Sequence, residues 1–68
     1  MTPTDLRAAR ERLGISQRGL AEALRMGKHG DRTVRAWEIG ERDIPGPVQV
    51  AVELMLERLA QAGSERSG

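Results

Sequence analysis

This chain has no cysteine, tyrosine or phenylalanine, and its only aromatic residue is Trp37. Without cysteine it can form neither a disulfide nor a thiolate metal site, and one histidine leaves little for a zinc site made of protein ligands alone. No apolar run approaches the roughly 20 residues of a membrane helix, and no signal-peptide pattern opens the chain. These absences predict a soluble, cytoplasmic protein with no cofactor, no metal and no membrane partner.

The sequence also has no stretch in which polar and apolar residues alternate as they do in a strand, and glycine and proline separate segments of helical period only. Its 68 residues suffice for one domain. A chain this short buries only about 60% of its unfolded surface. We therefore predict an all-α domain over residues 1–62 with a marginal core, which dimerisation would enlarge.

Capping residues predict where the first two helices begin and end. Thr2 suits the N-cap, Pro3 the first helical position, and Asp5 can complete a capping box. Gly14 would end this helix in the left-handed conformation. Ser16 would cap a second helix, whose inner face would carry Leu20, Ala21 and Leu24.

A third helix is predicted from about residue 31 to 39, after a polar loop with a glycine at each end, Gly27 and Gly30. Its buried side would carry Val34 and Trp37, and Gly40 would end it. A bracing helix, a turn and an exposed basic helix, in this order, are what a helix-turn-helix unit for DNA binding requires.

The fourth helix is predicted over about 47–62 and has more apolar residues than one face needs. At 100° per residue, one face that packs on the other helices holds Val48, Ala51, Val52, Met55 and Leu59. A second apolar side is left uncovered, which indicates a two-fold homodimer, although scattered exposed leucines are common. The predicted dimer interface consists of Val50, Leu54, Leu56, Glu57 and Arg58, with Glu53 also at its rim, and residues 63–68 are predicted to be a disordered tail.

Charge is unevenly distributed along the chain. The net charge of +1 does not by itself indicate nucleic-acid binding. Up to Arg42, however, there are nine basic and six acidic residues, whereas the remainder of the chain has two basic and four acidic residues. The positive excess therefore lies on the segment with the second and third helices. An asymmetry of this size also arises by chance among solvated helices.

With these elements in place, the chain resembles the Cro/C1-type (also called Xre-type) helix-turn-helix repressors of phages and mobile elements. The matching residues extend from 1 to about 56 and keep the family's order and spacing: Leu13-Gly-Ile-Ser-Gln17, Leu20-Ala21-Glu22, Thr33-Val34, Trp37-Glu38-x-Gly40 and Pro45. The last part, with Ile44, is also similar to small autorepressors found beside anti-CRISPR genes. The chain departs from the family in a longer turn at 26–30, in Gly30 where Ser or Thr is usual, and in Gly19 where Glu is frequent.

The resemblance implies that the third helix enters the DNA major groove. Arg32 and Arg35 would bond guanine edges bidentately, and Asp31 would accept a hydrogen bond from cytosine. Phosphate contacts are implied at the start of the second helix and after the third. The whole predicted DNA-binding set is Gln17, Arg18, Lys28, Asp31, Arg32, Thr33, Arg35 and Arg42. The alternative is an ordinary helix start, in which Asp31 favours the helix dipole and the arginines are only solvated.

Three residues are assigned structural roles. By resemblance, Arg10 pairs with Glu38 in a partly buried ion pair that ties the first helix to the recognition unit. Trp37 belongs to the core, because its helical spacing from Val34 places it there rather than against a base.

The predicted function is therefore a homodimeric, sequence-specific repressor of double-stranded DNA that occludes a promoter at an inverted-repeat operator. The alternative is an antitoxin-like or other protein-interaction module. An enzyme is not predicted, because the sequence shows no nucleophile–base pair, no phosphate-binding glycine loop and no metal cluster. No small-molecule pocket is indicated either.

Overall fold

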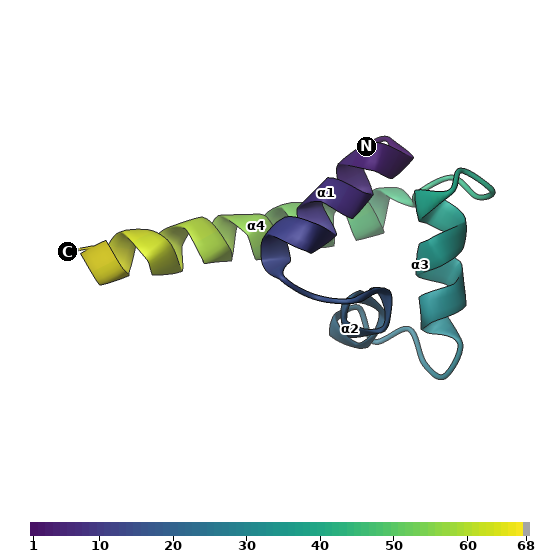
Figure 1. Cartoon of the computed structure of the whole chain (residues 1–68), viewed down its shortest axis with the longest axis horizontal. Coiled ribbons are helices and arrows are strands. Elements are labelled where there is room, and N and C mark those ends of the chain that lie inside the picture. The colour runs from purple at the N-terminus through teal and green to yellow at the C-terminus, as the bar shows by residue number, and fades with distance from the viewer. Residues whose placement is uncertain (68) are drawn as a thin grey trace.

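The computed structural model describes residues 1–62 in full and follows the fourth helix as far as Ser67. The part of the chain that it describes is all-α, as predicted, with four helices: α1 (Pro3–Leu13), α2 (Gln17–Ala23), α3 (Gly30–Glu38) and α4 (Gly46–Ser67). Figure 1 shows α1 lying along α4, α3 standing across one end of this pair, and α2 packed close to α3. The far end of α4 extends beyond the other helices, so the molecule measures 42 × 23 × 18 Å.

The caps of α1 and α2 form as predicted. The Thr2 hydroxyl accepts a hydrogen bond from the Asp5 amide at 3.1 Å, and the Asp5 carboxylate accepts one from the Thr2 amide at 3.0 Å. The backbone hydrogen bond from Thr2 holds the pKa of Asp5 below its usual value of 3.8. Gly14 ends α1 at φ +71°, and Ser16 caps α2 by accepting from the amide of Gly19 at 3.0 Å.

The later helices differ from their predicted limits. α3 begins at Gly30 and ends at Glu38, so both ends lie one residue earlier than predicted. Its N-cap residue, His29, makes no side-chain capping hydrogen bond, which explains why no capping signal located this helix start. The helical backbone of α4 begins at Gly46 and runs past the predicted end near residue 62. The predicted disordered tail, 63–68, lies outside the residues described in full.

Gly30 allows α2 and α3 to approach closely. It is buried at the start of α3, after a connector in which Arg25 and Gly27 have positive φ angles of 56° and 83°. A Cβ atom at position 30 would lie 2.6 Å from the Cβ atom of Met26 and 2.9 Å from that of Ala21. Both neighbours are rigid positions near the backbone. A serine or threonine, usual here in the family that the chain resembles, would not fit this packing.

Gly30→Ala is expected to destabilise the protein by about 1–3 kcal/mol, because overpacking outweighs the better helix propensity of alanine. Urea unfolding followed by tryptophan fluorescence measures this change. The matched control is Gly46→Ala, also at a helix start, where an added Cβ meets no atom within 4 Å outside the two chain neighbours. The following Pro47 disfavours a helical residue with a Cβ atom at position 46, which offsets the entropic gain from replacing glycine, so the control is expected to lie within about 1 kcal/mol of wild type. Equal stabilities of the two variants would contradict the packing argument.

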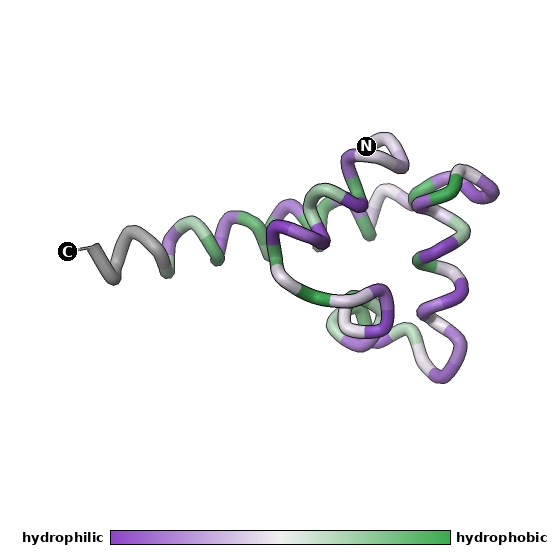
Figure 2. Tube along the Cα trace, viewed as in Figure 1, coloured by the Kyte–Doolittle hydropathy of each residue, from purple (hydrophilic) through white to green (hydrophobic). Residues whose placement is uncertain are grey.

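The core lies where the four helices meet. Val34 and Trp37 are buried, as predicted, and the Trp37 side chain is the only aromatic group in it. Hydrophobic segments recur along α4, whereas the connector before α3 is mostly hydrophilic (Figure 2). The buried residues are Leu6, Ala9, Leu20, Ala21, Val34, Trp37, Ile44 and Val52.

The surface of α4 confirms part of the predicted face assignment. Val50 and Leu54 are exposed, at 56% and 50%. Leu56, predicted to belong to the dimer interface, is instead half-buried against the core. Leu59 was predicted to pack on the core and is 42% exposed, because α4 has by then passed the helices that cover its first half. Glu57 and Arg58 are exposed.

None of the described helices combines the length and the apolar character that crossing a membrane requires.

Candidate nucleic-acid interface

A partly buried ion pair fixes α3 to α1. Arg10 donates from Nε to Glu38 Oε2 at 2.8 Å and from Nη2 to Glu38 Oε1 at 3.1 Å, which makes the contact bidentate. The Arg10 side chain is 15% exposed and the Glu38 side chain 4%. The hydrogen bond to Glu38 raises the pKa of Arg10 above its ordinary value. The pair predicted by resemblance is therefore present.

The same pair connects to the turn before α2. Arg10 Nη1 donates to the carbonyl oxygen of Ile15 at 3.0 Å, and Gln17 Nε2 donates to Glu38 Oε1 at 3.4 Å. One carboxylate thus links α1, α2 and α3. The side chain of Gln17, which the sequence predicts to contact a phosphate, has its amide nitrogen directed at Glu38 in this structure.

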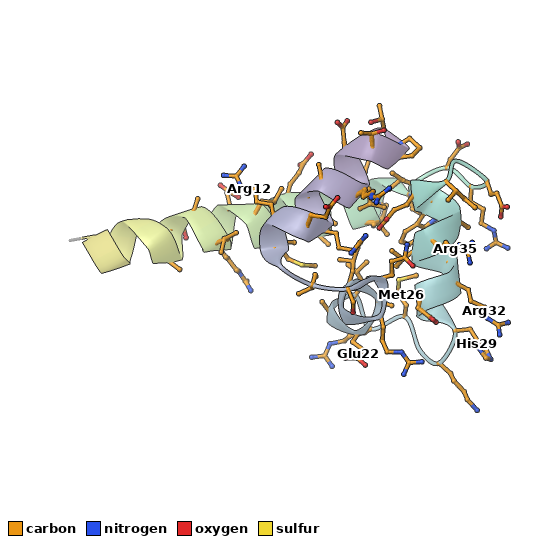
Figure 3. The ribbon with its side chains drawn as sticks, viewed as in Figure 1. Arg12, Glu22, Met26, His29, Arg32 and Arg35 are labelled. Carbon is orange, nitrogen blue, oxygen red and sulfur yellow. The ribbon has the colours of Figure 1, made fainter. Side chains whose placement is uncertain are left out.

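Arg32 and Arg35 are exposed on the outer face of α3. Among the residues with described side chains, the ion pairs are Arg7–Glu11 and Arg10–Glu38, so neither arginine of α3 is neutralised by an acid. Figure 3 shows Arg32 and His29 extending outward from this end of the molecule, away from α1. The structure therefore brings together two free guanidinium groups on the face that the sequence predicted.

Further cations flank the start of α3. Arg18 on α2 and Lys28 in the connector line a groove of about 250 Å³. Two acids, Glu22 and Asp31, line the same groove. Arg18 and Lys28 are exposed and Asp31 is half-buried. The groove thus carries two cations and two carboxylates, none of which forms an ion pair among the described side chains.

The two remaining predicted DNA-binding residues are Thr33 and Arg42. Thr33 is half-buried on the flank of α3. Arg42 is exposed in the turn after α3, where its amide hydrogen-bonds the Ala36 carbonyl oxygen at 3.3 Å. The turn is thus anchored to the helix through the backbone of Arg42.

Ile39 was missed as a surface residue by the sequence analysis, which counted it only as the end of the third helix. It is 58% exposed, more than any other large apolar residue of the described chain. With Ala36 it lines a shallow groove of about 310 Å³, whose other lining residues are Arg32, Arg35 and Glu41. Its spacing of four residues from Arg35 was the signal available in the sequence, because residues four apart are neighbours on a helix.

No protein-family model matches this chain, and no solved structure matches it. The chain is similar to part of the type II methyltransferase M.SsoII of Shigella sonnei, with 45% identity over 47 residues, which is 69% of this chain and 12% of that enzyme. It is also similar to the type II methyltransferase M1.ScrFI of Lactococcus lactis subsp. cremoris, with 38% identity over 55 residues, 81% of this chain and 14% of that enzyme. The chain thus covers only a small part of the length of either methyltransferase.

Proposed function

We propose that this chain is a sequence-specific DNA-binding regulator, which binds an inverted-repeat operator as a homodimer and represses transcription by occluding a promoter. The observation that carries the proposal is the pair of arginines, Arg32 and Arg35, which form no ion pair among the described side chains and lie on the outer face of a helix anchored by a partly buried ion pair. Guanidinium groups on a rigid helix can bond guanine edges in the major groove. The proposal agrees with the repressor family that the sequence resembles.

The cations around α3 support the electrostatic part of the proposal. Arg18 and Lys28, from α2 and the connector, line one groove near the start of α3, and Arg42 lies in the turn after α3. Contacts of this kind position a protein on the phosphate backbone without reading sequence. Each neutralised phosphate releases counterions, which makes the affinity depend on salt.

The uncovered side of α4 supports the homodimer. Val50 and Leu54 are four residues apart and both half exposed or more. A second copy would cover them and enlarge a core that is small for an independent domain. In a two-fold dimer the two α3 helices would need a separation of about 34–36 Å to enter successive major grooves.

The similarity to two type II methyltransferases bears on the size of the proposed DNA-binding unit. Segments similar to this chain occur within larger proteins, which agrees with a compact module that functions beside other domains. The chain covers only 12% and 14% of those enzymes, so their methyltransferase reaction is not part of the proposed function.

Selection of duplexes from a random DNA pool by the purified chain tests the proposal. We expect an inverted repeat whose half-sites are about 10 base pairs apart, centre to centre. With three phosphate contacts in each protomer, affinity for the selected duplex should fall about a thousandfold between 50 and 200 mM salt. Enrichment of no sequence, or binding that ignores salt, would contradict the proposal and favour a protein-interaction module.

The Leu54→Glu variant is the control for the dimer in this selection. It places a charge in the centre of the uncovered side of α4, so sedimentation should show a monomer. Circular dichroism should show an unchanged helix content. The variant should bind a single half-site weakly and no longer select an inverted repeat. A dimer that persists in this variant would exclude this side of α4 as the interface.

A further inference from the structure

An apolar strip lies beside the two free arginines of α3. Ala36 and Ile39 share the outer face of this helix, and Ile39 is 58% exposed. Ala36 follows Arg32 by four residues and Ile39 follows Arg35 by four, so each apolar side chain is the surface neighbour of a guanidinium group. A large apolar side chain between charged groups gains free energy when it is covered, so a partner with an apolar group at this position would be favoured.

The major groove of DNA offers one kind of apolar group, the methyl on C5 of a pyrimidine, which thymine carries and cytosine acquires on methylation. We propose that Ile39, with Ala36 as the floor of the contact, binds such a C5-methyl group beside the guanines bonded by the arginines. The inference rests on the proposed DNA-binding function and names the base chemistry that this face reads.

The dimensions fit this assignment. Neighbouring side chains four apart on a helix have Cβ atoms about 5–6 Å apart, whereas successive base pairs are about 3.4 Å apart. The methyl group should therefore lie one or two base pairs from a guanine contacted by Arg35. The shallow groove of about 310 Å³ between the arginines and Ile39 is open to a base edge and is larger than a methyl group needs.

The test replaces thymine by uracil, one position at a time, in the duplex obtained by selection. Uracil differs from thymine only by the missing methyl group, so hydrogen bonding is unchanged. At one position in each half-site, beside a guanine, we expect affinity to fall about fourfold, as for the loss of one buried methylene-sized group. Where the selected base at this position is cytosine, methylation of its C5 should instead raise affinity by a similar factor, which identifies methylated cytosine as the source.

The Ile39→Ala variant completes a double-mutant cycle. It should bind the thymine and uracil duplexes equally at that position, whereas wild type distinguishes them. Leu59→Ala removes a similar exposed apolar side chain on α4 and should keep the wild-type thymine-to-uracil ratio, whatever its effect on total affinity. Thermal unfolding of both variants checks that the fold is intact.

Two results would overturn the inference while leaving DNA binding in place. One is a selected duplex in which no methyl removal or addition changes affinity. The other is an Ile39→Ala variant that still distinguishes thymine from uracil as wild type does. Failure of the chain to bind any duplex would instead overturn the proposed function and this inference with it.

Discussion

Replacing Glu38 with glutamine is expected to destabilise the fold by about 3 kcal/mol, near the lower end of the range for breaking a buried ion pair. Arg10 donates from two nitrogens to the two carboxylate oxygens of Glu38. Glutamine supplies only one oxygen, so its amide nitrogen would oppose an N–H donor of Arg10. The guanidinium would then be left charged, only 15% exposed and without a counter-ion. The lower end applies because Arg10 keeps this partial access to water.

The loss would be large relative to total stability. Small domains are stabilised by about 0.05–0.15 kcal/mol per residue, so a chain of 68 residues has roughly 3–10 kcal/mol in all. Urea unfolding of the variant at low temperature measures the change. Glu41→Gln, an exposed acid in the turn after α3, is the matched control and should shift stability by less than about 0.5 kcal/mol.

A double variant distinguishes the cost of an unpaired charge from the cost of altered packing. Arg10→Met with Glu38→Met removes both charges and keeps much of the side-chain volume, so it should be clearly more stable than Glu38→Gln. If Glu38→Gln does not fold, this double variant remains measurable. A Glu38→Gln protein as stable as wild type would show that the pair does not hold α3 on α1.

Much of this architecture could be predicted from the sequence because its signals are local. Thr2, Pro3 and Asp5 specify the start of α1 by hydrogen bonds within three residues, and Gly14 specifies its end by a left-handed φ angle. The helical spacing of Val34 and Trp37 likewise predicts a buried face without knowledge of the partner helix. Such features depend on neighbours in the chain, so one sequence contains them.

Features that depend on distant neighbours were the ones missed. The exposure of Leu59 depends on where α1 stops covering α4. Helical periodicity predicts which face of α4 is apolar, but not how far along the helix that face is covered. The requirement for glycine at position 30 arises from Met26 and Ala21, which face it only after α2 and α3 pack. The exposure of Ile39 depends on the turn that leaves the end of α3. Gln17 is directed at Glu38 because the ion pair with Arg10 brings that carboxylate within reach.

The ion pair therefore also affects the predicted DNA-binding face, because both involve α3. Glu38 is the last residue of α3, and its contact with Arg10 fixes this end of the helix to α1. Weakening the pair should lower DNA affinity through loss of folded protein and misorientation of α3. Loss of a side chain that contacts a base should lower DNA affinity without any change in stability. Measuring affinity and stability together therefore distinguishes residues that hold the fold from residues that contact DNA.

Replacing Arg32 with alanine is expected to weaken binding to the selected duplex by at least about thirtyfold, with unchanged stability. A bidentate arginine–guanine contact contributes about 1–3 kcal/mol of discrimination, and a two-fold dimer loses it in both half-sites. Arg32 is exposed and forms no ion pair within the described residues, so its removal leaves no buried group unpaired.

Arg12→Ala is the matched control for this experiment. It removes the same charge from an exposed position at the end of α1, away from α3 (Figure 3). Fluorescence anisotropy at one salt concentration should give affinities within about twofold of wild type for this control, because the removed charge is far from the phosphates and is screened. A base contact also predicts that Arg32→Ala tolerates changes at one guanine position that wild type rejects. If both variants bind the selected duplex equally well and with the same base preferences, then Arg32 does not read DNA, and another surface must supply whatever specificity the selection reveals.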